Sequence, residues 1–227
     1  MNLRRPHASD LLPGPAPRLL TGLPQAAGQL LHLRSRALAQ TLLSLAGVSL
    51  AAGLALEWLT TLPSEEPLSR AFVTIAFPVL AASAVGISLH SHSPDADRTA
   101  SRRWWPLRTG YLLTMTALAS VLMSLSVPGD PAEFGVAAMV RNTIGATGVT
   151  ALFSTVLGAR ISWLPMFAYG GAALLVGPRE PGGADALWHW LMQPGPQSGA
   201  WVSAVAAFAV GAGVHALRGP LRTDDSR

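Results

Sequence analysis

An arginine and an asparagine, Arg141 and Asn142, stand side by side in residues 133–158, a stretch otherwise apolar enough to cross a membrane. A charged side chain in such a stretch is costly, and it usually pairs with another polar group inside the protein or marks a path for a substrate. The only acidic residue inside another apolar stretch is Glu57. We therefore predict that Glu57 pairs with Arg141. The alternative is that Arg141 snorkels to the outer headgroups and meets Glu133 or water.

Small residues follow Arg141 on its own face of the predicted helix. At helical spacing, Gly145 and Gly148 lie on that face. Glycines let another helix approach closely, so we expect this face to contact protein rather than lipid. Asn142 is expected to hydrogen-bond across helices. Glu57, Arg141 and Asn142 are therefore the candidates for a substrate path or for polar contacts inside the membrane.

Other groupings of chemically active residues are less specific. Residues 90–97, HSHSPDAD, combine histidine and aspartate, but their spacing fits no particular metal site and is typical of a helix start. Residues 65–70, EEPLSR, resemble the Glu-Glu-x-x-x-Arg signature of the CAAX-protease family, whose Phe-x-x-x-His and second histidine motifs the chain lacks. The apolar stretches contain no Ser/His/Asp set and no carboxylate pair. We therefore expect no catalysis, no metal and no cofactor.

The composition is that of an integral membrane protein. Half of the 227 residues are hydrophobic and only 12% are charged, whereas a soluble domain carries about 25% charged residues. The chain has no cysteine and no lysine, which excludes disulfides, thiolate metal sites and the Walker A loop that binds ATP phosphates. The net charge of +4 suits arginines on the inner flanks of a membrane protein better than it suits nucleic-acid binding.

Six apolar runs predict an all-α, polytopic bundle of six transmembrane helices in the plasma membrane. The runs are residues 38–60, 71–90, 110–127, 134–158, 161–177 and 200–217. With both ends cytoplasmic, 13 of the 16 arginines lie on the inner side, as the positive-inside rule requires. The predicted parts are a cytoplasmic Pro-rich tail at 1–36, which could include an amphipathic interfacial helix, the six-span domain at 37–218 and a cytoplasmic tail at 219–227.

Two further features concern packing. Ser203, Ala207 and Gly211 form a ridge of small residues in the last run, and such a ridge packs helices closely, within one chain or between two copies. The loop before that run contains ADALWHWLM, residues 184–192, which predicts a short Trp-rich helix suited to the membrane interface.

This outline resembles the permease subunit of type-two (ABC-2 class) ABC exporters. In that family an interfacial helix precedes the first span, a coupling loop joins the second and third spans, and short helices precede the sixth. The corresponding segments are 25–36, 94–108 and 186–192. The resemblance implies export of a small molecule, peptide or lipid-like substrate, a separate ABC ATPase, and a homodimer or a heterodimer with another permease.

The resemblance also assigns roles in the loop at residues 91–109. Arg98, Arg102 and Arg103 would meet acidic patches on the ATPase, with Trp104 and Trp105 as apolar anchors. The alternative for this loop is a basic anchor that touches anionic lipid.

Two other functions stay open. A secondary transporter with inverted three-helix repeats would use the prolines of its second and fifth runs, Pro78 and Pro165, to break helices around a midplane site. Against it, the runs hold few ionisable groups beyond Glu57, Arg141 and His215. A non-transporting membrane subunit, such as an immunity or regulatory protein, is the third class.

Overall fold

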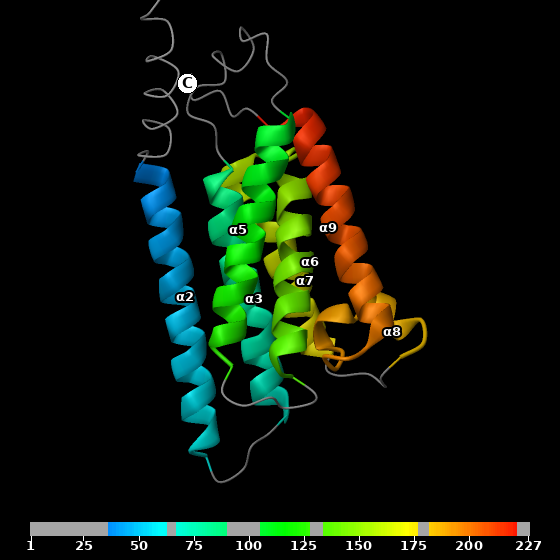
Figure 1. Ribbon diagram of the computed structural model, residues 1–227. Coiled ribbons are helices and arrows are strands. Elements are labelled where there is room, and N and C mark those ends of the chain that lie inside the picture. Colours follow the sequence, from blue (N-terminus) through cyan, green and yellow to red (C-terminus); the bar gives the residue numbers. More distant parts are fainter. Residues whose placement is uncertain (1–35, 63–66, 90–104, 128–133, 177–181, 222–227) are drawn as a thin grey trace, which may run out of the picture. The chain divides into compact units, whose positions relative to one another are not determined.

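The regular secondary structure of the described residues consists of helices joined by turns. The computed structural model describes residues 36–62, 67–89, 105–127, 134–176 and 182–221 (Figure 1). The long helices are α2 (Arg36–Thr60), α3 (Pro67–Ser88), α5 (Trp105–Leu125), α6 (Val136–Ser154), α7 (Leu164–Val176) and α9 (Ser198–Arg218). The short turns are η3 (Ala159–Ile161) before α7, and α8 (Asp185–Trp188) and η4 (Trp190–Met192) before α9. The prediction of an all-α fold is confirmed for these ranges.

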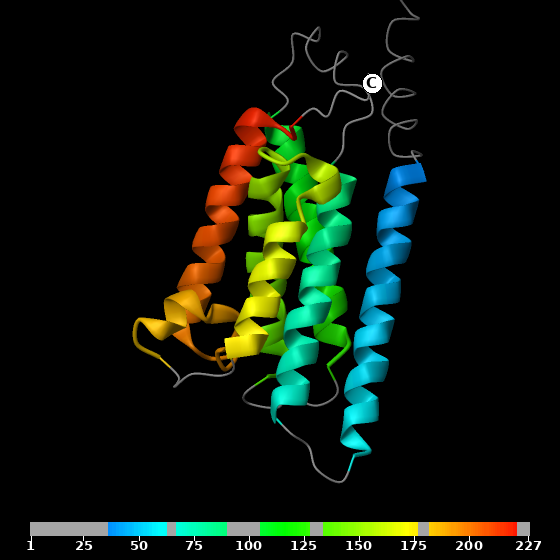
Figure 2. The same ribbon diagram turned by 180° about the vertical axis from the view of Figure 1, so that it is seen from behind.

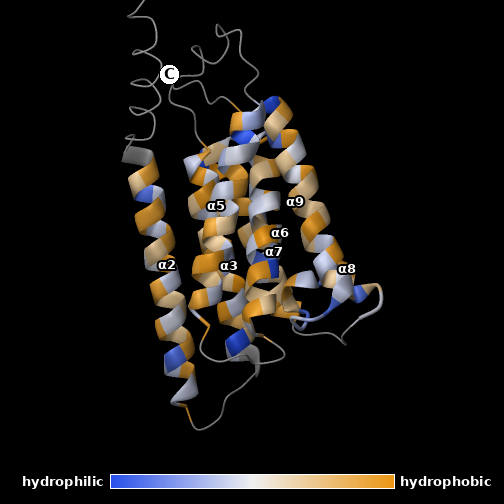
Figure 3. Cartoon of the chain, viewed as in Figure 1, coloured by the Kyte–Doolittle hydropathy of each residue, from blue (hydrophilic) through white to orange (hydrophobic). Residues whose placement is uncertain are grey.

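Five helical segments of the described chain are long and apolar enough to cross a membrane. They are residues 38–60, 69–88, 136–154, 159–176 and 198–218. Hydrophobic residues cover most of each long helix (Figure 3). The helix at the remaining predicted run, α5, has 21 residues but falls short in hydropathy, because Arg108 lies in its first turn. Its crossing of the membrane therefore stays a prediction.

Helix α6 is at the centre of the packing. The chain divides into two units, residues 1–39 and 40–227, and all contacts below lie within the second. Successive long helices there run in opposite directions (Figures 1 and 2), and α6 contacts α3, α5, α7 and α9. On α2, the Ser49 hydroxyl donates to the carbonyl of Leu122 on α5 at 2.6 Å, while Leu43 and Leu54 remain exposed.

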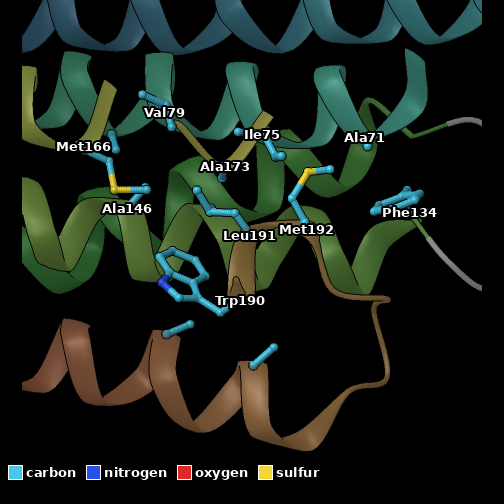
Figure 4. Packing of buried hydrophobic residues seen from close by; sticks show 13 residues of the cluster. Ala71, Ile75, Val79, Phe134, Ala146, Met166, Ala173, Trp190, Leu191 and Met192 are labelled. Atoms are coloured by element: carbon cyan, nitrogen blue, oxygen red, sulfur yellow. The ribbon is translucent and has the colours of Figure 1, made fainter. Parts of the chain in front are cut away.

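A hydrophobic core joins α3, α6, α7, α9 and the turn η4. Trp190, Leu191 and Met192 of η4 are buried in it together with Ile75 and Val79 of α3. Figure 4 shows these η4 side chains between α3 on one side and α9 on the other. Part of the core is thus supplied by a short loop turn, which enters the bundle from the end where α6 and α9 begin.

Helix α9 ends at Gly219, and two features of the structure favour glycine at this position. Gly219 has φ of 72°, a conformation that favours glycine, and its N–H donates to the carbonyl of His215 at 2.8 Å. A Cβ at this position would also lie 2.8 Å from Nη1 of Arg108. The turn therefore ends α9 and lets α5 approach it closely.

Candidate functional site

The segment between α7 and α9 folds back into the bundle. We call residues 182–197 the inserted segment; it contains α8 and η4. Leu191 and Gln193 are completely buried, and Met192 is 2% exposed. Gln193 is held by its Oε1, which accepts the N–H of Gly182 at 3.2 Å. Main-chain carbonyls of this segment therefore lie inside the bundle, where they need donors.

Arg141 supplies donors for two of these carbonyls. It lies in the second turn of α6, and its side chain is completely buried. Nη2 donates to the carbonyl of Gln193 and Nη1 to that of Pro194, both at 2.8 Å, while Nε donates to Oδ1 of Asn142 at 3.1 Å. Polar groups within membranes are usually satisfied in this way, by backbone carbonyls or by one another. The guanidinium thus binds a non-helical part of its own chain.

Asn142 joins the same segment to α3. Its Nδ2 donates to the carbonyl of Leu191 at 3.0 Å and to the carbonyl of Thr74, on α3, at 2.8 Å. Neighbouring residues on a helix point about 100° apart, so the pair Arg141-Asn142 reaches two elements that one residue could not. The amide and the charge stand side by side because together they bind three carbonyls of the inserted segment and one of α3.

The carbonyl of Thr74 needs this donor because of a proline. Pro78 lies inside α3 and has no N–H to donate to the carbonyl four residues earlier, which belongs to Thr74. Asn142 supplies the missing donor at 2.8 Å. Helix α3 continues through Pro78 to Ser88. The expectation that Pro78 breaks the helix is therefore wrong, because a neighbouring helix replaces the lost hydrogen bond.

We expect residues 78 and 142 to be energetically coupled. In Pro78→Ala the new N–H can bind the Thr74 carbonyl, so Asn142→Leu should then cost about 1 kcal/mol less than in the parent chain. The measurement is a double-mutant cycle on unfolding in mixed micelles. Pro165→Ala is the matched control because Pro165 lies in the first turn of α7, where no helical hydrogen bond is lost. Equal costs of Asn142→Leu in all three backgrounds would contradict the coupling.

Trp190 packs against α6, on the face that carries Arg141 and Gly145. A Cβ added to Gly145 would lie 2.4 Å from Cη2 of Trp190 and 3.1 Å from Cα of Ala204, so glycine makes room for both. The indole also stacks on Tyr169 of α7, with ring centroids 6.1 Å apart. The Tyr169 hydroxyl donates to the carbonyl of Trp188. The inserted segment is therefore packed against α6, α7 and α9 as well as hydrogen-bonded.

The tightest helix contact lies further along α6, where it crosses α9. A Cβ on Gly211 would lie 1.9 Å from the carbonyl oxygen of Gly148, and a Cβ on Gly148 would lie 2.2 Å from Cα of Phe208. The Ala207 carbonyl is also close to Gly148. The two glycine-bearing faces thus pack against each other within one chain. Ser203 is half-buried, and its hydroxyl bonds to the Gly199 carbonyl of its own helix.

A buried histidine completes the polar contacts at the other end of α6. His215 Nδ1 lies 3.0 Å from Oγ of Ser154, and this Oγ also lies 2.7 Å from the Ala151 carbonyl oxygen. Ser154 Oγ and His215 Nδ1 thus share a hydrogen bond between α6 and α9. Both side chains are buried. The His215 side chain is thus hydrogen-bonded to Ser154 within the bundle.

The predicted pair between Glu57 and Arg141 is not formed. Arg141 bonds to two carbonyls and to Asn142, while Glu57 lies on an exposed position of α2. Sequence reasoning placed Arg141 against protein but missed its partners, because main-chain carbonyls have no signature in a sequence. Pro78 was the one sequence feature that pointed to such a contact. A proline within a helix leaves the carbonyl four residues earlier without its helical donor, so a donor from elsewhere is needed.

Several other predicted features fall outside the described ranges. Arg98, Arg102, Arg103 and Trp104 lie there, as does the segment before Arg36. Trp105 begins α5 and is exposed. The Trp-rich helix divides into α8 and η4, and its two tryptophans differ: Trp188 is 74% exposed and Trp190 is 6% exposed. Trp188 alone has the exposure of an interfacial residue.

The arrangement holds a segment of the chain in place through hydrogen bonds from Arg141 and Asn142. Among the described residues no three His, Cys, Asp or Glu side chains are grouped so that they could hold a metal ion. Comparison of the chain with models of protein families, with curated proteins and with solved structures gives no match. The inserted segment and its contacts with Arg141 and Asn142 are therefore the features on which a function has to be argued.

Proposed function

We propose that the chain is the membrane-spanning subunit of an ABC exporter of the type-two class, driven by a separate ATPase. The observation that carries this proposal is the inserted segment: two short helical turns, α8 and η4, enter the bundle directly before the last long helix. Short helices before the sixth span are part of the outline that the sequence resembles. The substrate class would be a small molecule, a peptide or a lipid-like compound.

The proposal includes six spans with both ends on the cytoplasmic side. The six long helices alternate in direction (Figure 1), and α5, with 21 residues, is about 31 Å long at 1.5 Å per residue. That length matches a hydrocarbon core of about 30 Å. The inserted segment would then lie on the outer side, and the arginine-rich residues 91–109 on the inner side, in agreement with the positive-inside rule.

The chain would use ATP only through a partner. It has no lysine, so it cannot contain the lysine of a Walker A loop. The loop at residues 91–109 would dock on the ATPase, and Trp105 at the start of α5 would pass the movement to the bundle. Its exposure at the end of a long helix supports this role.

A secondary transporter with inverted repeats has less support. Of the polar groups that could couple an ion gradient, Arg141 and His215 are buried and hydrogen-bonded within the bundle, and Glu57 is exposed. Pro165 lies at the second position of α7, where proline does not interrupt a helix. The two prolines therefore lack the matched helix breaks that mark a midplane site.

The experiment is a pull-down of the tagged protein from its native membrane, with co-purifying chains identified by mass spectrometry. We expect an ABC ATPase with the parent chain and its loss in the triple variant Arg98→Ala, Arg102→Ala, Arg103→Ala. The physical reason is the loss of three charges from the proposed docking loop. The matched control removes three arginines of a different predicted inner segment, the carboxyl-terminal one: Arg218→Ala, Arg222→Ala, Arg227→Ala.

Each part of the proposal has its own contrary outcome. If no ATPase co-purifies with the parent chain, the exporter proposal is wrong, and a stand-alone or regulatory membrane protein takes its place. If the ATPase co-purifies equally with both triple variants, the exporter proposal stands and the docking role of Arg98, Arg102 and Arg103 is wrong.

A further inference from the structure

We propose that Arg141 is a positioning residue that holds residues 190–194 inside the bundle. Without its guanidinium, this part of the inserted segment would leave the bundle while the long helices stay packed. The inference concerns a contact within the chain. It does not depend on whether the chain is part of an exporter.

The hydrogen bonds explain why the segment needs Arg141. Past Met192 the segment is no longer helical, and the carbonyls of Gln193, which is completely buried, and of Pro194, which is partly buried, accept hydrogen bonds from Arg141 inside the bundle. A carbonyl with no donor in such a place is costly, and hydrogen bonds from a charged donor are the strong ones. Both of these carbonyls receive a donor from the same guanidinium at 2.8 Å. Removing Arg141 therefore takes the donor from two acceptors at once, one of them on a buried residue and the other on a partly buried one.

The geometry requires a guanidinium. Its planar fork reaches two successive carbonyls with Nη1 and Nη2 while Nε bonds to Asn142. A lysine ammonium is a single point donor, and it cannot span the same three acceptors in this arrangement. Arg141→Lys should therefore keep the charge and lose part of the hold on the segment.

The long helices have contacts that do not involve the segment. Gly148 meets Gly211 of α9 seven residues beyond Arg141, about 10 Å further along α6. A Cβ on Gly86 of α3 would meet Cγ2 of Thr150 at 2.2 Å, so α3 and α6 are also in close contact there. These contacts remain when Arg141 is changed. Release of the segment is thus a local event and differs from unfolding of the bundle.

The chain is well suited to a labelling test because it contains no cysteine. Single cysteines are placed at Met192, which is 2% exposed, at Pro196, which is exposed in the same segment, and at Met123 of α5, which is 0% exposed. The full-length protein is labelled in membranes with a membrane-impermeant maleimide. Pro196→Cys identifies the accessible side and sets the reference rate. Met123→Cys is the matched control for a buried methionine outside the segment.

In the parent background we expect Pro196→Cys to be labelled and Met192→Cys and Met123→Cys to be protected. Arg141→Met should raise the labelling rate of Met192→Cys by about tenfold or more, the population change expected from losing a charge-assisted hydrogen bond. Met123→Cys should stay protected, and Arg141→Lys should give an intermediate rate. If the Arg141→Met protein does not accumulate, the Arg141→Lys comparison with the parent decides the question.

Three results would overturn the proposal. The first is labelling of Met192→Cys in the parent background as fast as that of Pro196→Cys, since the segment would then not be inside the bundle. The second is unchanged protection of Met192→Cys when Arg141 is replaced. The third is labelling of Met123→Cys in the same variant, because Arg141 would then support the whole bundle and not the segment.

Discussion

Replacing Gly211 by alanine is expected to disrupt the contact between α6 and α9, at a cost of about 1–3 kcal/mol or more. The new Cβ would lie 1.9 Å from the carbonyl oxygen of Gly148, 2.7 Å from its carbonyl carbon and 3.1 Å from its Cα. These are main-chain atoms of a helix, so they cannot rotate away as a side chain could. Either the two helices separate or one of them bends.

Gly213→Ala is the matched control for this prediction. It makes the same chemical change two residues along the same helix, where a Cβ would meet nothing within 4 Å. Alanine favours a helix over glycine by about 1 kcal/mol, so Gly213→Ala should leave the stability unchanged or slightly raised. The check is thermal unfolding in detergent followed by size-exclusion fluorescence. Equal stability of the two variants would show that α6 and α9 are further apart than the 1.9 Å Cβ approach implies.

Asn142→Leu is expected to destabilise the protein by about 3 kcal/mol or more. Leucine has a similar volume but removes the donors to the Thr74 and Leu191 carbonyls and the acceptor of the Arg141 Nε–H. Each buried group left without a partner costs about 1–3 kcal/mol. Three elements, α3, α6 and η4, lose a shared contact at once.

The control for Asn142→Leu is a buried polar residue on the same helix that makes no such contact. Thr150 is 0% exposed, and its Oγ1 has no hydrogen-bond partner within the described ranges. Thr150→Val keeps the shape and removes only an unpaired hydroxyl, so it should be neutral or stabilising. Both variants can be compared by unfolding in mixed micelles. A loss from Thr150→Val as large as that from Asn142→Leu would mean that any change in the core of α6 is damaging.

The positions of the helices could be predicted from the sequence because apolar runs determine them. The helices cover the predicted runs, and differences occur at the ends: α3 begins at Pro67, and α7 begins at Leu164 after the turn η3. The glycines of α6 and α9 lie on the faces that their spacing indicates, because three- and four-residue spacing on a helix is a local property. Only the identity of the facing helix had to come from the structure.

The partners of Arg141 could not be predicted in the same way. Charge pairing suggested Glu57, since side-chain charges are visible in a sequence. The actual acceptors are carbonyls of Gln193 and Pro194, which every residue has and which become special only when a loop enters the bundle. The prediction that the Trp-rich segment lies at the membrane interface failed for Trp190 for a related reason. An indole is compatible with the interface, but it also fits the gap beside Gly145, where Trp190 lies.

The bond between Asn142 and the Thr74 carbonyl also constrains the order in which the protein is completed. Helix α3 is synthesised before α6, so the acceptor left bare by Pro78 has no donor until α6 arrives beside it. Residues 191–194 come later still and occupy the remaining donors of Arg141 and Asn142. A chain interrupted before the inserted segment would therefore hold a cation whose Nη1 and Nη2 lack the acceptors that they have in the finished protein. The unfinished product thus differs chemically from the finished one, because it presents unpaired donors on α6 that the last part of the chain later occupies.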